Sequence, residues 1–169
     1  CQDFHLIDET NGYLIVAVAD GAGSARLADI GARVACTWAV QHLKTACGQP
    51  TQADSAEGLI RDAFNEARFE VEQAAILEDA ESRDLASTLL LALVGEDHAV
   101  FGQVGDGAAI YDVSGQLLLA HWPEQEAVNL TDFLTSAPLE QTLTIKQVSG
   151  SIDRIALMTD GLTQLLLDN

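Results

Sequence analysis

Short apolar runs and helical patterns alternate along the chain. Tyr13–Ala19 (YLIVAVA) is branched and apolar and ends in Asp20-Gly21, which predicts a buried strand. Over residues 29–47 apolar side chains recur at helical spacing and are followed by Gly48 and Pro50, so this segment is predicted to be a helix packed on a sheet. A second long helix is expected from Ser55 onward, where apolar positions again fall three or four apart: Leu59, Ala63, Ala67, Val71 and Ala74.

The pattern then becomes typical of strands, in the runs 85–94, 99–104, 108–113, 116–121, 142–148 and 154–159. The short links 95–98, 105–107 and 114–115 separate the first four, which predicts antiparallel pairing. Residues 122–139 have no clear period and contain Pro123 and Pro138, so they are expected to cross the surface. Strand runs kept apart from helical runs favour an α+β layered domain over a doubly wound parallel sheet.

Composition narrows the classes of function. The 169 residues, 48% of them hydrophobic, suit one domain with a sizeable core, here residues 1–169. A net charge of -18 disfavours nucleic acid and anionic membranes as partners. This acidity either keeps the protein soluble or includes carboxylates that bind cations. No apolar run reaches the ~18 residues of a membrane span.

Cysteine and histidine usage adds two expectations. Cys1, Cys36 and Cys47 form neither a CxxC pair nor a disulfide framework, which fits a reducing cytosol and a cytoplasmic protein. The four histidines have no zinc-finger spacing.

Three apolar runs end in the same dipeptide, at Asp20-Gly21, Asp106-Gly107 and Asp160-Gly161. Asp-Gly is also a strong hairpin signal, and a hairpin requires a returning strand. Only Asp106-Gly107 is followed by one, so the hairpin interpretation is strong for Asp106 and weak for Asp20 and Asp160. Carboxylates at the ends of buried strands are both rigid and accessible, as a site requires.

Ligand sets made only of oxygen suit Mg²⁺ or Mn²⁺ better than zinc or copper. Two such ions sharing Asp20 could activate a water and stabilise charge on a phosphoryl group. Gly21 would allow its own carbonyl to approach an ion, and Gly21-Ala22-Gly23 would leave room for substrate. Alternatively, these small residues only permit a tight turn from strand to helix.

Five short motifs, in this order along the chain, resemble the type 2C metal-dependent serine/threonine protein phosphatases, especially their bacterial branch. Cys1-Gln2-Asp3 resembles the family's opening Asn-Gln-Asp element, and VADGAGS resembles its Asp-Gly-X-Gly signature. Ser87-Thr88-Leu89 is similar to the pair that enters a central strand, and Val104-Gly105-Asp106 resembles a Val-Gly-Asp-Ser step. Residues 159–163 (TDGLT) are similar to the late Ser-Asp-Gly-Leu-Thr element.

The resemblance implies a sandwich of two antiparallel sheets flanked by helices. It implies that Asp20 bridges two metals, that Gly21 adds its carbonyl, and that Asp3 and Asp160 each hold a metal. Asp106 would correspond to the carboxylate of a third, weaker metal, so two or three Mn²⁺ or Mg²⁺ ions are expected. The implied reaction is attack of a metal-activated water on phosphoserine or phosphothreonine in a protein, a step in signal transduction, without a phosphoenzyme.

The chain also departs from the family pattern. The last metal-binding carboxylate normally follows a further helix and strand, so Asp168-Asn169 is not assigned to it, and no arginine precedes Cys1. Ala22 stands where some members carry histidine, which excludes a histidine general acid there. We therefore expect a domain that lacks its first strand and its last helix and strand. The alternatives are a catalytically impaired phosphatase-like binding or regulatory module, and an acidic structural domain whose Asp-Gly pairs are only turns.

Overall fold

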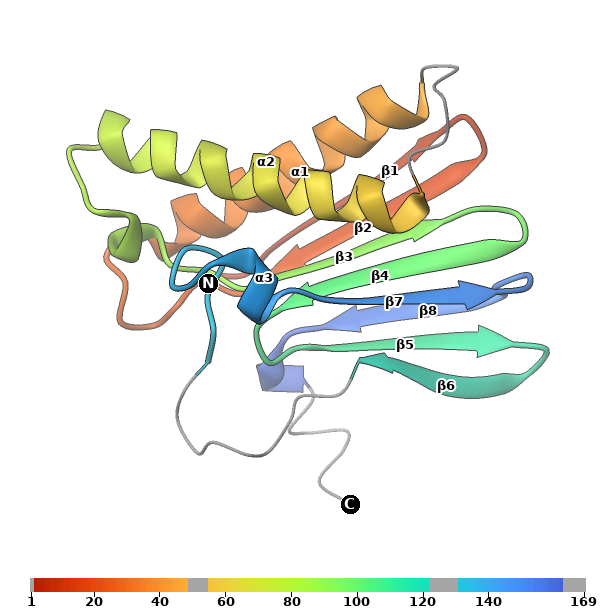
Figure 1. Ribbon diagram of the computed structural model, residues 1–169. Helices are drawn as coiled ribbons and strands as arrows, with labels where there is room; N and C mark the ends of the chain where they lie inside the picture. Colours follow the sequence, from red (N-terminus) through yellow and green to blue (C-terminus); the bar gives the residue numbers. More distant parts are fainter. Residues whose placement is uncertain (1, 49–54, 122–130, 163–169) are drawn as a thin grey trace.

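The computed structural model describes residues 2–48, 55–121 and 131–162 (Figure 1). Its elements are β1 (Phe4–Thr10), β2 (Tyr13–Ala19), α1 (Ala28–Cys47), α2 (Ala56–Leu77), the 3-10 helix η1 (Ser82–Leu85), β3 (Leu89–Val94), β4 (His98–Val104), β5 (Ala108–Val113), β6 (Gln116–His121), α3 (Leu139–Thr142), β7 (Thr144–Ser149) and β8 (Arg154–Met158). None of the described helices has both the length and the apolarity needed to cross a membrane.

The strands form two antiparallel sheets that lie face to face. One sheet has five strands in the order β1-β2-β3-β4-β7, and the other has three in the order β6-β5-β8. Helices α1 and α2 cover the outer face of the five-stranded sheet (Figure 1). The expected sandwich of two antiparallel sheets flanked by helices is confirmed.

Strand β2 is apolar throughout because it has a hydrophobic layer on each face. Ile15 and Ala17 belong to the core between the five-stranded sheet and the helices, and Val16 belongs to the core between the sheets. Phe101 and Tyr111 stack across the second layer with ring centroids 5.7 Å apart. A strand buried on both faces reads as a continuous hydrophobic run, whereas one with a wet face alternates.

Strand β1 is an alternating strand that the apolar runs did not predict. It pairs with β2 through a turn at Asn11-Gly12, where both residues have positive φ angles of 48° and 81°. Two positive φ values are the geometry of a type I′ hairpin, for which Asn-Gly is the preferred sequence.

Several predicted bounds need correction. The strand expected over 85–94 begins only at Leu89, because Ser82–Leu85 forms a 3-10 helix. The strand expected from Thr142 begins at Thr144, after the short helix α3. The hairpin at Ser114-Gly115 is confirmed. The helix stop at Pro50, the crossing over 122–130 and the helical run after Leu162 lie outside the described residues.

The hairpin interpretation of Asp106-Gly107 is wrong. Strand β4 pairs with β3 and β7, whereas β5 pairs with β6 and β8 in the other sheet. The segment 105–107 therefore carries the chain from one sheet to the other. Strand β5 follows this segment in the sequence, but it belongs to the opposite sheet and does not pair with β4.

A tight contact joins α1 to the segment that leads into β3. A Cβ atom added to Gly31 would lie 2.0 Å from the Leu85 carbonyl oxygen. Because backbone carbonyls cannot yield as a flexible side chain does, only glycine fits at this position of the helix.

Gly31→Ala is therefore expected to destabilise the protein by roughly 1–3 kcal/mol, as overpacking does, although alanine is normally the better helix former by ~1 kcal/mol. Urea unfolding followed by circular dichroism would measure the change. The control is Gly23→Ala, where the added Cβ meets nothing within 4 Å, and which should stay within about 0.5 kcal/mol of the parent. A Gly31→Ala variant as stable as the parent would contradict this packing account.

Candidate active site

The acidic residues singled out from the sequence gather at one end of the sandwich. Strands β2, β4 and β8 finish at this end and β1, β3 and β5 begin there, whereas the β1–β2, β3–β4 and β5–β6 turns lie at the other (Figure 1). The β1–β2 register pairs Phe4 with Ala19, so one step further places Asp3 opposite Asp20. Asp160 follows β8 after one residue, Thr159, and begins a helical turn.

Three predicted ligands are in contact. The carboxyl group of Asp20 hydrogen-bonds to the carboxyl groups of Asp3 and Asp160. These side chains come from three strands of two sheets, so the sandwich and not the local sequence brings them together. The idea that the acidic residues occupy unrelated turns does not fit this arrangement.

Burial and like charge raise the pKa of Asp20. Desolvation is the largest cause, and hydrogen bonds and charge repulsion from Asp3 and then Asp160 add to it, bringing the pKa from 3.8 to about 7. Two neighbouring carboxylates resist simultaneous ionisation, so a proton is retained between them. Without a cation, this cluster is partly protonated at neutral pH.

The described carboxyls contact one another directly and do not surround a common point. Among the residues that the structure describes, no group of three His, Cys, Asp or Glu side chains is arranged as it would be around a metal ion. The chemistry of the donors nevertheless suits a hard divalent cation, because they are all carboxylates, are crowded and hold a proton that a cation could replace.

The backbone around Gly21 is fixed on several sides. Its N–H donates to the Gln2 carbonyl at 3.3 Å, and it forms an isolated antiparallel bridge with Ser87. A Cβ atom here would lie 2.8 Å from both the Cβ atom and the carbonyl oxygen of Ala28. Gly21 is therefore required for the close approach of α1, whether or not its carbonyl has a further role.

Asp106 lies in the segment that joins the two sheets. Its carboxylate accepts a 2.7 Å hydrogen bond from the Thr131 hydroxyl. The Gln103 side chain, 4% exposed, donates to the carbonyls of Gly105 and Gly107 at 2.8 and 2.7 Å. These bonds hold the backbone on each side of Asp106.

Sequence reasoning missed two buried polar residues near the acidic end, Gln103 and the hydroxyl of Thr88. The Asp20 N–H donates to the Thr88 Oγ1 at 2.9 Å. Thr88 belongs to the Ser87-Thr88-Leu89 motif, but no local pattern in the sequence indicates this hydrogen bond. A polar residue inside a run as apolar as HAVFGQV was the available signal for Gln103, since buried amides need hydrogen-bond partners.

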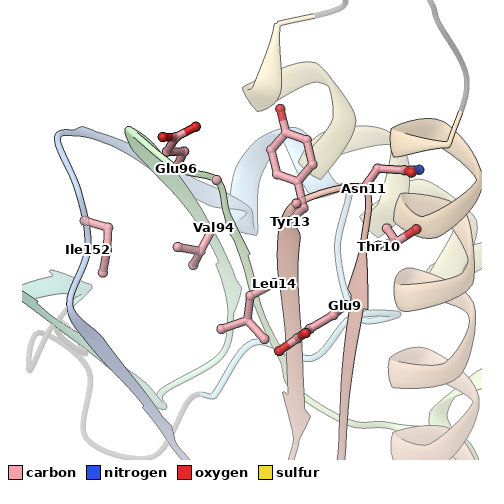
Figure 2. A pocket seen from close by; sticks show the side chains of 10 residues that line it. Glu9, Thr10, Asn11, Tyr13, Leu14, Val94, Glu96 and Ile152 are labelled. Carbon is pink, nitrogen blue, oxygen red and sulfur yellow. The ribbon is translucent and has the colours of Figure 1, made fainter.

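A cavity of about 530 Å³ adjoins the carboxyl cluster between the β1–β2 hairpin and β8. Asp3 and Thr159 line one end of it, and the remaining walls are mainly apolar, including Val16, Val18 and Leu157. A second cavity of about 570 Å³ lies at the opposite end of the sandwich, where Leu14, Val94 and Ile152 approach it from three segments (Figure 2). Of these two cavities, only the one lined by Asp3 lies next to the carboxyl cluster.

Comparison with known proteins agrees with this architecture. A family model described as Protein phosphatase 2C matches residues 1–169. Serine/threonine-protein phosphatase 3 of Escherichia coli (strain K12) is 27% identical over 174 residues, which cover 99% of this chain and 68% of that protein.

Two solved structures show the same fold. The serine/threonine phosphatase Stp1 from Staphylococcus aureus aligns with a TM-score of 0.73 at 18% identity, over 99% of this chain and 73% of its own. RsbX in complex with magnesium aligns with a TM-score of 0.60 at 17% identity, over 96% of this chain and 67% of its own.

The raised pKa of Asp20 makes metal-free stability depend on pH. A carboxyl with a higher pKa in the folded state, about 7 against 3.8, stabilises the fold fully below pH ~4 and loses this effect as pH rises through ~7. Asp20→Asn removes the charge. In EDTA at pH 8 the variant is expected to melt at a higher temperature than the parent, with the difference vanishing at pH 4.

Thermal unfolding in EDTA between pH 4 and pH 8 would measure both effects. Asp62→Asn, at an exposed position of α2, is the matched control and should leave the pH profile unchanged. Equal melting temperatures for Asp20→Asn and the parent at pH 8 would show that the three carboxyls do not repel one another.

Proposed function

The chain belongs to the protein phosphatase 2C family and is a serine/threonine protein phosphatase, and we propose that it hydrolyses phosphoserine and phosphothreonine esters of proteins at the carboxyl cluster. The observation that carries the proposal is the contact of Asp20 with both Asp3 and Asp160 at one end of the sandwich. Three carboxyls held by rigid strands beside a cavity form a site that is both fixed and accessible.

We propose Mn²⁺ or Mg²⁺ as the cofactor, two or three ions in number, which Asp20, Asp3, Asp160 and the Gly21 carbonyl would hold. Asp106 is the proposed ligand of a third ion. When bound, such ions supply an activated water and neutralise charge on the phosphoryl group. The protein carries a net charge of -18, so a phosphate dianion would be repelled from this end without cations.

The residues of the chain contribute positioning and space. The strands fix the three carboxyls in direction, and the proton held on Asp20 is the group that a cation would displace. A Cβ atom on Gly23 would meet nothing within 4 Å, so the loop after Asp20 leaves room for a phosphorylated side chain. The adjoining cavity offers apolar surface to the substrate residues that flank the phosphorylated one.

Several finer points belong to the same proposal. The substrate is a phosphorylated protein, and residues 1–169 form a single domain that acts in the cytoplasm, where Cys36 and Cys47 would stay free thiols, as they are here. In the described ranges 2–48, 55–121 and 131–162, Asp3 and Asp160 are the side chains whose hydrogen bonds and charges raise the pKa of Asp20. We propose that a further carboxylate and a phosphate-binding arginine complete the site from outside these ranges.

The test is hydrolysis of p-nitrophenyl phosphate and of a phosphothreonine peptide by the full-length protein with 1–10 mM MnCl₂ or MgCl₂, conditions chosen to saturate a weak ~mM site. The parent is expected to be active, EDTA to abolish activity, and Asp20→Ala to lose at least ~100-fold, since even residues behind the ligands cost 10–100-fold. Asp62→Asn should match the parent.

Activity of Asp20→Ala equal to that of the parent would rule out this site. Binding of Mn²⁺ by calorimetry without hydrolysis of either substrate would instead identify a phosphatase-like binding or regulatory module. These two results separate a wrong site from an impaired enzyme.

A further inference from the structure

A single buried threonine contacts both aspartate-bearing segments. Thr88 is 4% exposed and stands just before β3, opposite Asp20 in the β2–β3 register. Its N–H donates to the Asp20 carbonyl at 2.8 Å, and its hydroxyl accepts from the Asp20 N–H at 2.9 Å.

This exchange differs from a regular antiparallel ladder. In a hydrogen-bonded pair, two opposite residues exchange both N–H to carbonyl bonds. Here the Thr88 hydroxyl replaces the Thr88 carbonyl as the acceptor of the Asp20 N–H. The backbone of Asp20, and with it the direction of its carboxyl group, is therefore held by a side chain at the point where the ladder ends.

The methyl group of Thr88 contacts the other aspartate-bearing segment. Gly105 has a φ angle of +112°, and a Cβ atom added to it would lie 2.5 Å from Thr88 Cγ2 and 2.7 Å from Thr88 Cβ. The backbone just before Asp106 thus lies directly against this side chain, while Gln103 holds the carbonyls of Gly105 and Gly107.

We propose that Thr88 is a positioning residue for both segments. Its hydroxyl fixes the orientation of Asp20, and its methyl group fixes the position of the backbone at Gly105, just before Asp106. The proposal rests on the proposed function insofar as these carboxylates take divalent cations. The hydroxyl and the methyl group then act on different aspartates, so two substitutions can separate their effects.

Thr88→Val keeps the shape and removes the hydroxyl, leaving the partly buried Asp20 N–H without its acceptor. Thr88→Ser keeps the hydroxyl and removes the methyl group. The matched control is Thr142→Val, the same chemical change at a buried hydroxyl that has no hydrogen-bond partner among the described residues.

Three measurements are made on each full-length variant. Amide hydrogen exchange of the metal-free protein reports on the Asp20 N–H group, which has the Thr88 hydroxyl as its acceptor. The NMR amide signals of Gly105 and Asp106 report on the backbone beside the methyl group, and calorimetric titration with MnCl₂ reports affinity. Thr88→Val is expected to speed exchange at Asp20 at least ~10-fold and to weaken Mn²⁺ binding ~10–100-fold, as loss of groups that orient ligands does. Thr88→Ser should keep Asp20 protection and Mn²⁺ affinity within ~3-fold of the parent, with shifted NMR amide signals at Gly105 and Asp106.

Thr88→Val with parental Asp20 exchange and parental Mn²⁺ affinity would overturn the proposal, as would Thr142→Val with the same losses, because a general loosening would then explain them. If Thr88→Val does not fold, Thr88→Ser decides: tenfold weaker Mn²⁺ binding or lost Asp20 protection would contradict the role of the hydroxyl. If the parent neither binds Mn²⁺ nor hydrolyses phosphate esters, the proposed function fails, and the exchange of the Asp20 amide together with the NMR signals of Gly105 and Asp106 tests the positioning alone.

Discussion

The pairing of β2 with β1 on one side and β3 on the other is the constraint on which the candidate active site depends. Strand β1 turns Phe4 and Leu6 toward the helices, and a slip by one residue would reverse its two faces and expose both side chains. Hydrophobic burial thereby fixes the register. The register in turn places Asp3 and Thr88 on either side of Asp20.

The end of the sandwich that carries Asp3, Asp20 and Asp160 would be unfavourable by itself. Its three carboxyls are kept together by the rest of the fold. Three carboxyls in contact repel one another and are partly desolvated, which raises the pKa of the central one to about 7. Two apolar layers, one under the helices and one between the sheets, hold the strands in place despite this repulsion. The same crowding that weakens the metal-free protein prepares the site for cations.

Most helices and strands could be predicted because their apolar periods are strong, and Asp20 and Asp160 could be singled out because no returning strand follows them. The pairing partners could not be predicted from period alone. Asp106-Gly107 precedes a strand whether the chain turns back or changes sheets, so its hairpin interpretation failed. Strand β1 was missed although Asn11-Gly12 signalled its turn. The role of the Thr88 hydroxyl depends on a contact 68 positions away, which no local pattern contains.

The contact between Thr88 and Gly105 also constrains how this sequence can change. Any side chain at position 105 would collide with the threonine and would have to adopt a φ angle of +112°, which residues other than glycine rarely do. Removing the methyl group at position 88 would leave the 2.7 Å approach to the Thr88 Cβ atom, and it would not change the angle. The two positions are therefore restricted for different reasons: position 105 by its backbone angle and the close side chain, and position 88 by the hydroxyl that accepts the Asp20 N–H.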